Sequence, residues 1–238
     1  MSATDHGVGT RVLGPDALAA AGGAGAGHAA TFASTEHFNL QTARALTVSE
    51  SNGRASIYLA ALSSNLIALA FIGQMSRLGV AFYAFALILL PVLAFVGTVT
   101  FVRLVQSSIE DIAYAHRIGL VRSYYLRISP ELEPYLVVFR AMQGASFQGA
   151  PGAWQLTLTA AGMVAVVNSV VVASCTGLVL VAAGVHSLAI PVAAGALVGA
   201  GAFALHERHH RRALHSYSPG AVDRAAILIP PSQPADTA

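Results

Sequence analysis

The chain has 238 residues, of which 55% are hydrophobic and only 10% are charged. Soluble domains carry about 25% charged residues, so this composition excludes an ordinary water-soluble globule. The apolar residues fall in long uncharged runs, which indicates membrane spans. The formal net charge of +2 is too small to predict binding to nucleic acid, and the single cysteine, Cys175, cannot form an intramolecular disulfide.

The N-terminal segment is rich in Ala, Gly, Ser and Thr, and we expect a disordered tail over residues 1–40. It holds no apolar block behind a basic start, so no signal peptide is predicted. A short helix should follow, because Glu50 lies four residues before Arg54 and the two side chains can pair on one helical face. Asn52 and Gly53 are poor helix formers, so we expect a loose join there.

Two uncharged runs, residues 55–74 and 80–102, are each long enough to cross a bilayer. The first carries Ser63, Ser64 and Asn65 at its middle, and polar groups at that depth favour contact with other helices over contact with lipid. Pro91 lies near the centre of the second run and predicts a kink, either a hinge for gating or a static bend.

The segment over residues 103–127 carries several charges, so it cannot stay in lipid. We expect an amphipathic helical arm that packs on a partner or on the lipid interface. Its apolar stripe consists of Val105, Ile109, Ile112, His116 and Leu120. Ser129 and Pro130 are typical of a helix start, so a further helix is predicted over about residues 130–143, before a glycine- and proline-bearing break over 144–152.

Two more uncharged runs, residues 156–182 and 188–205, bring the predicted spans to four. The third span contains Asn168 and Ser169. In the fourth, Gly195 and Gly199 are four residues apart and form a small-residue face suited to close helix packing. A basic flank and a disordered C-terminal tail are expected over residues 206–238.

The predicted architecture is all-α: a polytopic membrane protein with four transmembrane helices over residues 41–205 and a cytoplasmic helical segment over 103–152. Four spans place both termini and this central segment on the same side of the membrane. Every arginine except Arg77 lies on that side. The excess of arginine on cytoplasmic loops then predicts that both termini are cytoplasmic.

The predicted spans contain no Asp, Glu, Lys or Arg, which argues against a proton- or ion-coupled transporter but leaves a passive pore open. The polar residues that could line a pore, or alternatively hydrogen-bond between helices of one subunit, are Ser63, Ser64, Asn65, Asn168 and Ser169. No phosphate-binding glycine loop and no Ser/His/Asp arrangement is recognisable, so we predict no catalytic residue and no cofactor.

The segment from His206 to His210 matches the H-E-x-x-H pattern, in which two imidazoles bind zinc and the glutamate, here Glu207, acts as a base. A zinc peptidase needs a third ligand, and only one further histidine and two aspartates follow. The pattern also ends a span, where histidine and arginine serve as a stop-transfer cluster. We therefore predict a basic flank without metal; structural metal binding and a metallopeptidase are the alternatives.

Three short segments resemble a known group of proteins: ESNGR at residues 50–54, RSYY at 122–125 and PELEPY at 130–135. Over roughly residues 46–136 they resemble uncharacterised actinobacterial four-span integral membrane proteins. The resemblance implies a four-span fold and carries no activity with it. In architecture alone, the chain is also similar to small multi-span effectors of bacterial conflict systems, whose spans assemble into membrane-disrupting oligomers.

The sequence thus predicts a non-enzymatic, oligomeric integral membrane protein of the cell inner (plasma) membrane. It would be a pore or a membrane effector controlled through its cytoplasmic helices. Its partners would be the lipid bilayer, further copies of the chain and a cytoplasmic protein. The alternatives are a membrane scaffold that presents the cytoplasmic helices to a soluble partner, and a metal-dependent membrane enzyme built on His206 and His210.

Overall fold

The computed structural model describes residues 15–134 and 157–217, with side chains from residue 27 onward. Four long helices make up nearly all of these residues, which include no strand. The helices are α1 (Pro15–Met75), α2 (Val80–Ile128), α5 (Ala160–Ala182) and α6 (Ala189–Ser216), and a short 3-10 helix η1 (Pro130–Leu132) follows α2. Each of the four is long and apolar enough to cross a membrane, which confirms the all-α architecture with four candidate spans.

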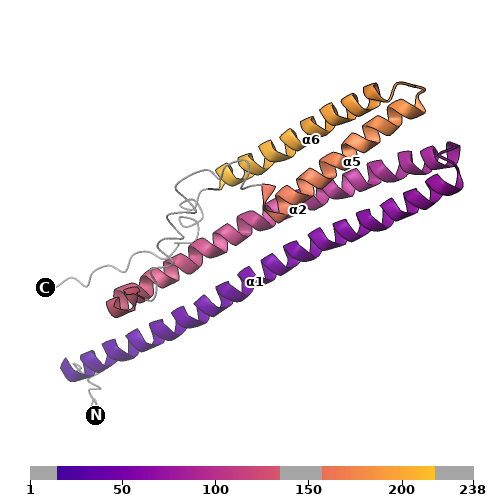
Figure 1. Ribbon diagram of the computed structural model, residues 1–238. Helices are drawn as coiled ribbons and strands as arrows, with labels where there is room; N and C mark the ends of the chain where they lie inside the picture. Colours follow the sequence, from indigo (N-terminus) through magenta and orange to yellow (C-terminus); the bar gives the residue numbers. More distant parts are fainter. Residues whose placement is uncertain (1–14, 135–156, 218–238) are drawn as a thin grey trace, which may run out of the picture.

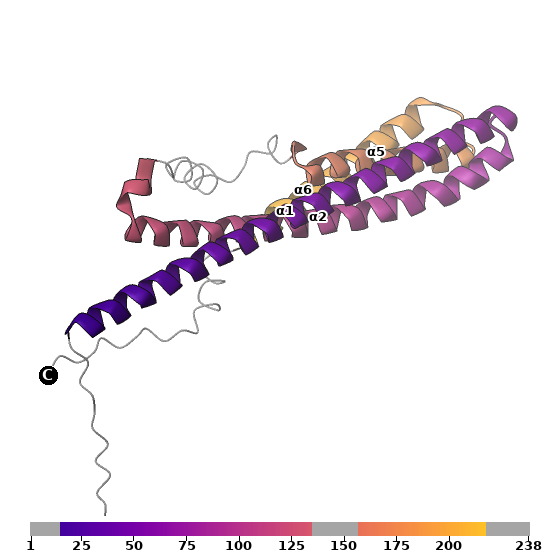
Figure 2. The same ribbon diagram turned by 90° about the horizontal axis from the view of Figure 1, so that it is seen from below.

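Helix α2 lies at the centre of the arrangement. It packs against α1 on one side and α5 on the other, and α6 packs mainly on α5. The two hairpin turns, residues 76–79 and 183–188, lie at the same end of the molecule, whereas α1 begins and α6 ends toward the opposite end (Figure 1). At that opposite end α1 and α2 extend well beyond α5 and α6 (Figure 2).

The core is formed by apolar side chains at helical spacing. Along α2 the buried residues recur every three or four positions, as at Leu90, Leu93, Gly97, Phe101 and Leu104, which is the pattern of one continuous buried face. The opposite surfaces of all four helices are also apolar in the bundle. Exposed residues there include Ile57, Leu66, Phe95, Val170 and Leu197. An outer surface of this kind suits lipid rather than water.

Helices α1 and α2 are much longer than a bilayer requires. They contain 61 and 49 residues, so they measure about 90 and 74 Å, whereas a bilayer core of about 30 Å needs about 20 residues. We call the parts beyond the spans, residues 37–54 of α1 and 103–128 of α2, the stalk. Leu40, Thr47 and Ile118 are buried in the stalk, and Val105 is buried in the bundle core next to it.

The predicted amphipathic arm is a helix, because α2 continues without a break to Ile128. Along its predicted stripe Val105 is buried, Ile109, Ile112 and His116 are half-buried, and Leu120 is exposed. The stripe therefore packs well near the bundle and less well toward the far end of the stalk.

Two predictions about the N-terminal part are wrong. The expected disordered tail over residues 1–40 is helical from Pro15, and residues 1–14 lie outside the described residues. The expected loose join at Asn52 and Gly53 is absent, since α1 passes through it. Extending an existing helix costs much less than starting one, and α1 is held by packing on both sides of these residues. The predicted ion pair also forms, with Arg54 Nε 3.0 Å from Glu50 Oε1.

The boundaries of the last two spans also differ from the prediction. Helix α5 begins at Ala160 rather than near residue 156, because the Thr159 hydroxyl accepts a hydrogen bond of 3.0 Å from Gly162 N and caps the helix. Helix α6 continues past residue 205 to Ser216. The predicted helix over 130–143 is described only at its start, and the rest of it, the break over 144–152 and the C-terminal tail after residue 217 lie outside the described residues.

Candidate functional site

A buried polar contact joins three helices within their candidate spans. Asn168 of α5 is fully buried. Its Oδ1 accepts a hydrogen bond of 3.2 Å from the Tyr58 hydroxyl of α1, and its Nδ2 donates one of 3.0 Å to Thr98 Oγ1 of α2. Unsatisfied polar groups are costly in hydrocarbon, so this contact fixes the positions of the three helices relative to one another.

Gly97 makes room for that contact. A Cβ atom at this position would lie only 2.6 Å from both Asn168 Cγ and the Tyr58 hydroxyl, and closer still to Asn168 Oδ1. Any side chain at Gly97 would therefore displace the amide and the phenol together.

The other polar residues predicted for the spans bond within their own helices. Ser63, Ser64, Asn65 and Ser169 each donate to the carbonyl oxygen four residues earlier, at 2.6–2.9 Å. Ser63 and Ser64 are exposed on the outer surface of α1, Asn65 is half-buried and Ser169 is buried against α6. The structure thus brings Asn168 together with α1 and α2, but does not gather these five residues at one place.

The two glycines predicted to allow close helix packing lie between α5 and α6, and the proline predicted to bend a helix lies in α2. A Cβ atom at Gly195 would lie 2.7 Å from Ala173 O of α5, and one at Gly199 would lie 2.8 Å from Ala173 Cβ. Both glycines therefore allow α6 to approach α5 closely. Pro91 lies inside α2 with its ring exposed.

A cluster of aromatic rings lies at the end of the bundle that faces the stalk. The ring of Phe101 in α2 lies edge-on to His206 and His210 of α6, with centroid distances of 4.5 and 6.2 Å, and 6.1 Å from His209. His206 Nδ1 lies 2.7 Å from Ala202 O of its own helix. Phe101 thus lies against both histidines of the H-E-x-x-H pattern. No three His, Cys, Asp or Glu residues of the described chain gather as a metal site.

His210 is the most deeply buried member of this cluster, with 2% of its surface exposed. It lies beyond the uncharged run of α6. Burial lowers the pKa of His210; the nearby Glu207 acts in the opposite direction, and His209 adds to the lowering.

A polar cavity of about 390 Å³ lies beside His210, where the stalk meets the bundle. All four long helices, or the residues that cap them, contribute to its wall. Most of the lining side chains carry hydroxyl, amide or ionisable groups: Thr47, Ser51, Asn52, Ser107, Ser108, Asp111, Thr159 and His210. Hydroxyl, amide and ionisable side chains are thus more frequent at this junction between stalk and bundle than in the apolar core of the bundle.

An ion pair links the two stalk helices next to this cavity. Arg44 of α1 donates from Nε to Asp111 Oδ1 at 2.7 Å and from Nη2 to Oδ2 at 3.1 Å. The hydrogen bond to Asp111 raises the pKa of Arg44. The two side chains are 40% and 28% exposed, and a pair in such contact with water contributes about 1 kcal/mol or less. We call this pair the stalk clasp.

Sequence reasoning missed the partners in these contacts. Tyr58 and Thr98 look like ordinary span residues, and nothing in the sequence joins them to Asn168. Only the cost of burying an amide in a bilayer signalled that Asn168 needed a partner. Nothing in the sequence singles out Phe101, because a phenylalanine at the end of a span can pack against lipid or against any neighbouring helix.

No protein-family model, no curated protein and no solved structure matches this chain.

Proposed function

We propose that this chain is a non-enzymatic, oligomeric integral membrane protein, a pore or membrane effector whose action on the bilayer is controlled through the stalk. The observation that carries the proposal is that α1 and α2 each pass without a break from the stalk into a candidate span. A tilt or rotation of the stalk must then move both spans as rigid extensions. The weak stalk clasp and the polar cavity lie where such a movement would pivot.

The proposed setting is the cell inner (plasma) membrane, crossed four times, with both termini and the stalk in the cytoplasm. The common end of the two hairpin turns supports this topology, because it carries only Arg77 as a permanent charge while the other arginines of the described chain lie toward the stalk (Figure 1). A reporter domain fused after Ala238 should be active only inside the cell. Activity only outside would contradict the orientation.

The proposed oligomer would use the outer face of α1. Ser56, Ala60, Ser63 and Ser64 share one side of this helix at bilayer depth, and all four are exposed. Small residues and serine hydroxyls on a lipid-facing side favour close contact with another helix. A second copy of the chain would cover this face.

Within one bundle, the buried Asn168 amide is hydrogen-bonded to Tyr58 and Thr98. A permeation path would therefore have to form between copies of the chain. Purified protein reconstituted into dye-loaded liposomes should therefore release dye, with a rate that rises more steeply than in proportion to protein concentration. Replacement of Ser63 by the bulkier leucine should reduce release, whereas Val192→Leu, on the exposed face of α6, should not.

One observation favours the scaffold as a second candidate. Phe32, Phe38 and Leu46 are exposed on the part of α1 outside its span, where large apolar side chains commonly mark a protein contact. In that case the liposomes would stay sealed at every protein concentration. Phe38→Ser would then abolish recruitment of the soluble partner without altering the membrane bundle.

A further inference from the structure

The polar cavity between the stalk and the bundle has the size of a ligand site. Its volume is about 390 Å³, whereas small-molecule sites measure about 300–1,000 Å³ and one water occupies about 30 Å³ in the liquid. Residues of α1, α2 and α6 line it together with Thr159 and Ala160 at the start of α5. The cavity can therefore hold a molecule larger than water in contact with all four long helices.

His210 is the least exposed polar residue of this lining. Its side chain is 2% exposed, and neither ring nitrogen makes a hydrogen bond with another described residue. Buried polar side chains nearly always have a partner, so an imidazole that lines a cavity without one points to a molecule inside that cavity. Burial lowers the pKa of His210 and thus favours the uncharged ring, which accepts through one nitrogen and donates through the other.

The hydroxyl groups of the lining act mainly as acceptors. Thr47, Ser51 and Ser108 each donate their hydrogen to the carbonyl oxygen four residues earlier, at 2.9–3.1 Å. Each hydroxyl oxygen keeps lone pairs that can accept a hydrogen bond from a molecule in the cavity. The wall therefore offers more free acceptors than free donors.

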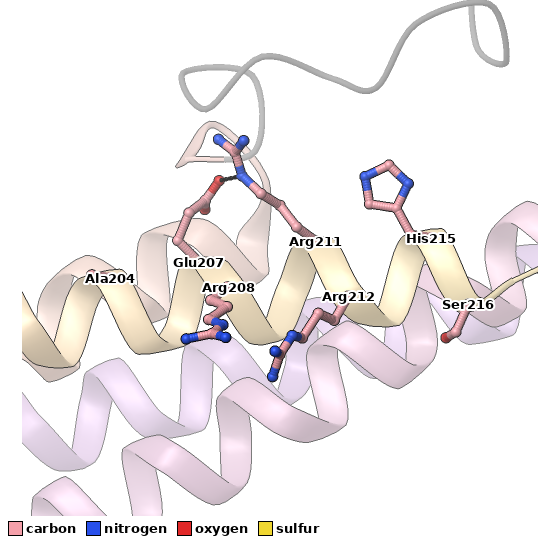
Figure 3. A pocket seen from close by; sticks show the side chains of 7 residues that line it. All are labelled: Ala204, Glu207, Arg208, Arg211, Arg212, His215 and Ser216. Atoms are coloured by element: carbon pink, nitrogen blue, oxygen red, sulfur yellow. Dashed lines mark hydrogen bonds and ion pairs between the residues drawn. The ribbon is translucent and has the colours of Figure 1, made fainter.

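A carboxylate adds to these acceptors. Among the described residues that line the cavity, Asp111 alone carries a permanent charge. Each of its oxygens accepts one hydrogen bond from Arg44, and about two of its four lone-pair sites remain. Glu207 is not part of the lining, because it pairs with Arg211 along α6 at 2.7 Å (Figure 3). The one charge that faces the cavity is thus negative.

We propose that the cavity binds a primary ammonium group carried on a short carbon chain. Such a group has three N–H donors, which match the accepting oxygens of Asp111 and of the hydroxyl groups. The His210 ring would hydrogen-bond to the same molecule. The carbon chain would contact the apolar part of the lining, formed by Val48, Ile112 and Leu214. This binding goes beyond the proposed control of permeability and does not depend on it.

The lining disfavours other small ions. A phosphate or carboxylate would place its oxygens against accepting oxygens and beside Asp111. The positive end of α5 offers it little, because the Thr159 hydroxyl already accepts from Gly162 N there. A transition metal lacks ligands, since the described chain gathers no three His, Cys, Asp or Glu residues. A bare sodium or potassium ion would leave most of the volume empty.

The experiment is equilibrium dialysis of radiolabelled n-butylamine, which is protonated at about pH 7, against the detergent-purified full chain. We expect saturable binding of one amine per chain that unlabelled butylamine displaces. Tetramethylammonium has the charge but no N–H donor, and butyrate has the opposite charge, so neither should displace the label. Displacement by phosphatidylethanolamine but not by phosphatidylcholine would make a lipid headgroup the source of the ammonium group; displacement by ethanolamine alone would make the source a soluble amine.

Charge variants separate the site from the stalk clasp. Asp111→Asn keeps the shape of the side chain and should weaken butylamine binding by about 10- to 100-fold, as expected for a hydrogen bond to a charged group. Arg44→Gln also breaks the clasp but leaves the carboxylate, so it should bind at least as tightly as the parent. Glu110→Gln makes the same charge change at an exposed position of α2 and should bind like the parent.

A hydroxyl variant leaves the clasp intact. Thr47→Val should weaken binding by about five-fold, whereas Thr31→Val, which removes a hydroxyl with the same bond on the exposed part of α1, should not. Absence of saturable binding, displacement by tetramethylammonium or butyrate, or equal losses in Asp111→Asn and either of its controls would overturn the proposal. Because no permeability is measured, these outcomes are independent of the liposome experiment.

Discussion

The sharpest structural prediction concerns Gly97→Ala. The added Cβ would lie 2.6 Å from Asn168 Cγ and 2.6 Å from the Tyr58 hydroxyl, well inside van der Waals contact. The amide must move, so its hydrogen bonds to Tyr58 and Thr98 are lost together. Overpacking costs about 1–3 kcal/mol, and each interhelical hydrogen bond in a membrane contributes about 0.6–2 kcal/mol. We expect a loss of about 2–7 kcal/mol in the free energy of unfolding.

The assay is reversible unfolding in mixed micelles with increasing SDS, followed by circular dichroism. Gly201→Ala is the matched control, because a Cβ at that position meets nothing within 4 Å and it also lies in a candidate span. Helix propensity alone predicts that this control is neutral or more stable by up to about 1 kcal/mol. If Gly97→Ala unfolds at the same SDS fraction as the control, the buried contact does not hold the three helices together.

Three further predictions test the amide, the stalk and the junction. Asn168→Leu should lower the free energy of unfolding by about 1–3 kcal/mol, because the hydrogen bonds to Tyr58 of α1 and Thr98 of α2 are lost. Asn65→Leu should lower it by less, because the Asn65 side chain bonds within α1. Equal effects of the two variants in the SDS assay would count against the contact. Ile112→Asp should disrupt assembly on detergent gel filtration far more than Arg117→Ala, because Ile112 is half-buried in the stalk and Arg117 is exposed; the reverse order would show that the stalk is not packed. Burial lowers the pKa of His210 below the ordinary value of a histidine, about 6.5, so the unfolded chain binds more protons at mildly acidic pH and stability should fall as pH drops through about 6.5. His210→Gln should flatten this dependence below about pH 6.5 in thermal unfolding, and a variant that keeps the full acid sensitivity would refute the assignment.

Much of the fold follows from the sequence because long uncharged runs leave few alternatives. The runs around Ser63, Pro91, Asn168 and Gly199 predict helices of bilayer length, and these are present. The helix between residues 15 and 40 was not predictable from composition, because its many glycine, serine and threonine residues are weak helix formers. It is extended from a packed helix rather than formed alone.

The candidate site was predictable only in part, because the sequence names single polar residues but not their neighbours. Asn168 stood out as an amide in a span, yet its pairing with Tyr58 and Thr98 depends on the rotation of three helices. The stalk clasp could not be predicted for the same reason, since Arg44 and Asp111 are 67 residues apart in sequence. Such contacts are set by packing, which a single sequence does not encode locally.

The most direct test of control through the stalk is the rate of dye release from liposomes carrying three charge variants of the stalk clasp. Asp111→Arg places two arginines opposite each other and should open the clasp, Arg44→Asp should do the same with two aspartates, and the double exchange should restore the pair. A change of about 1 kcal/mol at the clasp corresponds to about a five-fold change in the balance of states. We predict release at least several-fold faster in each single variant and near the parent rate in the double exchange. Liposomes that remain sealed with all four proteins, or a double exchange that leaks as fast as the single variants, would contradict the account.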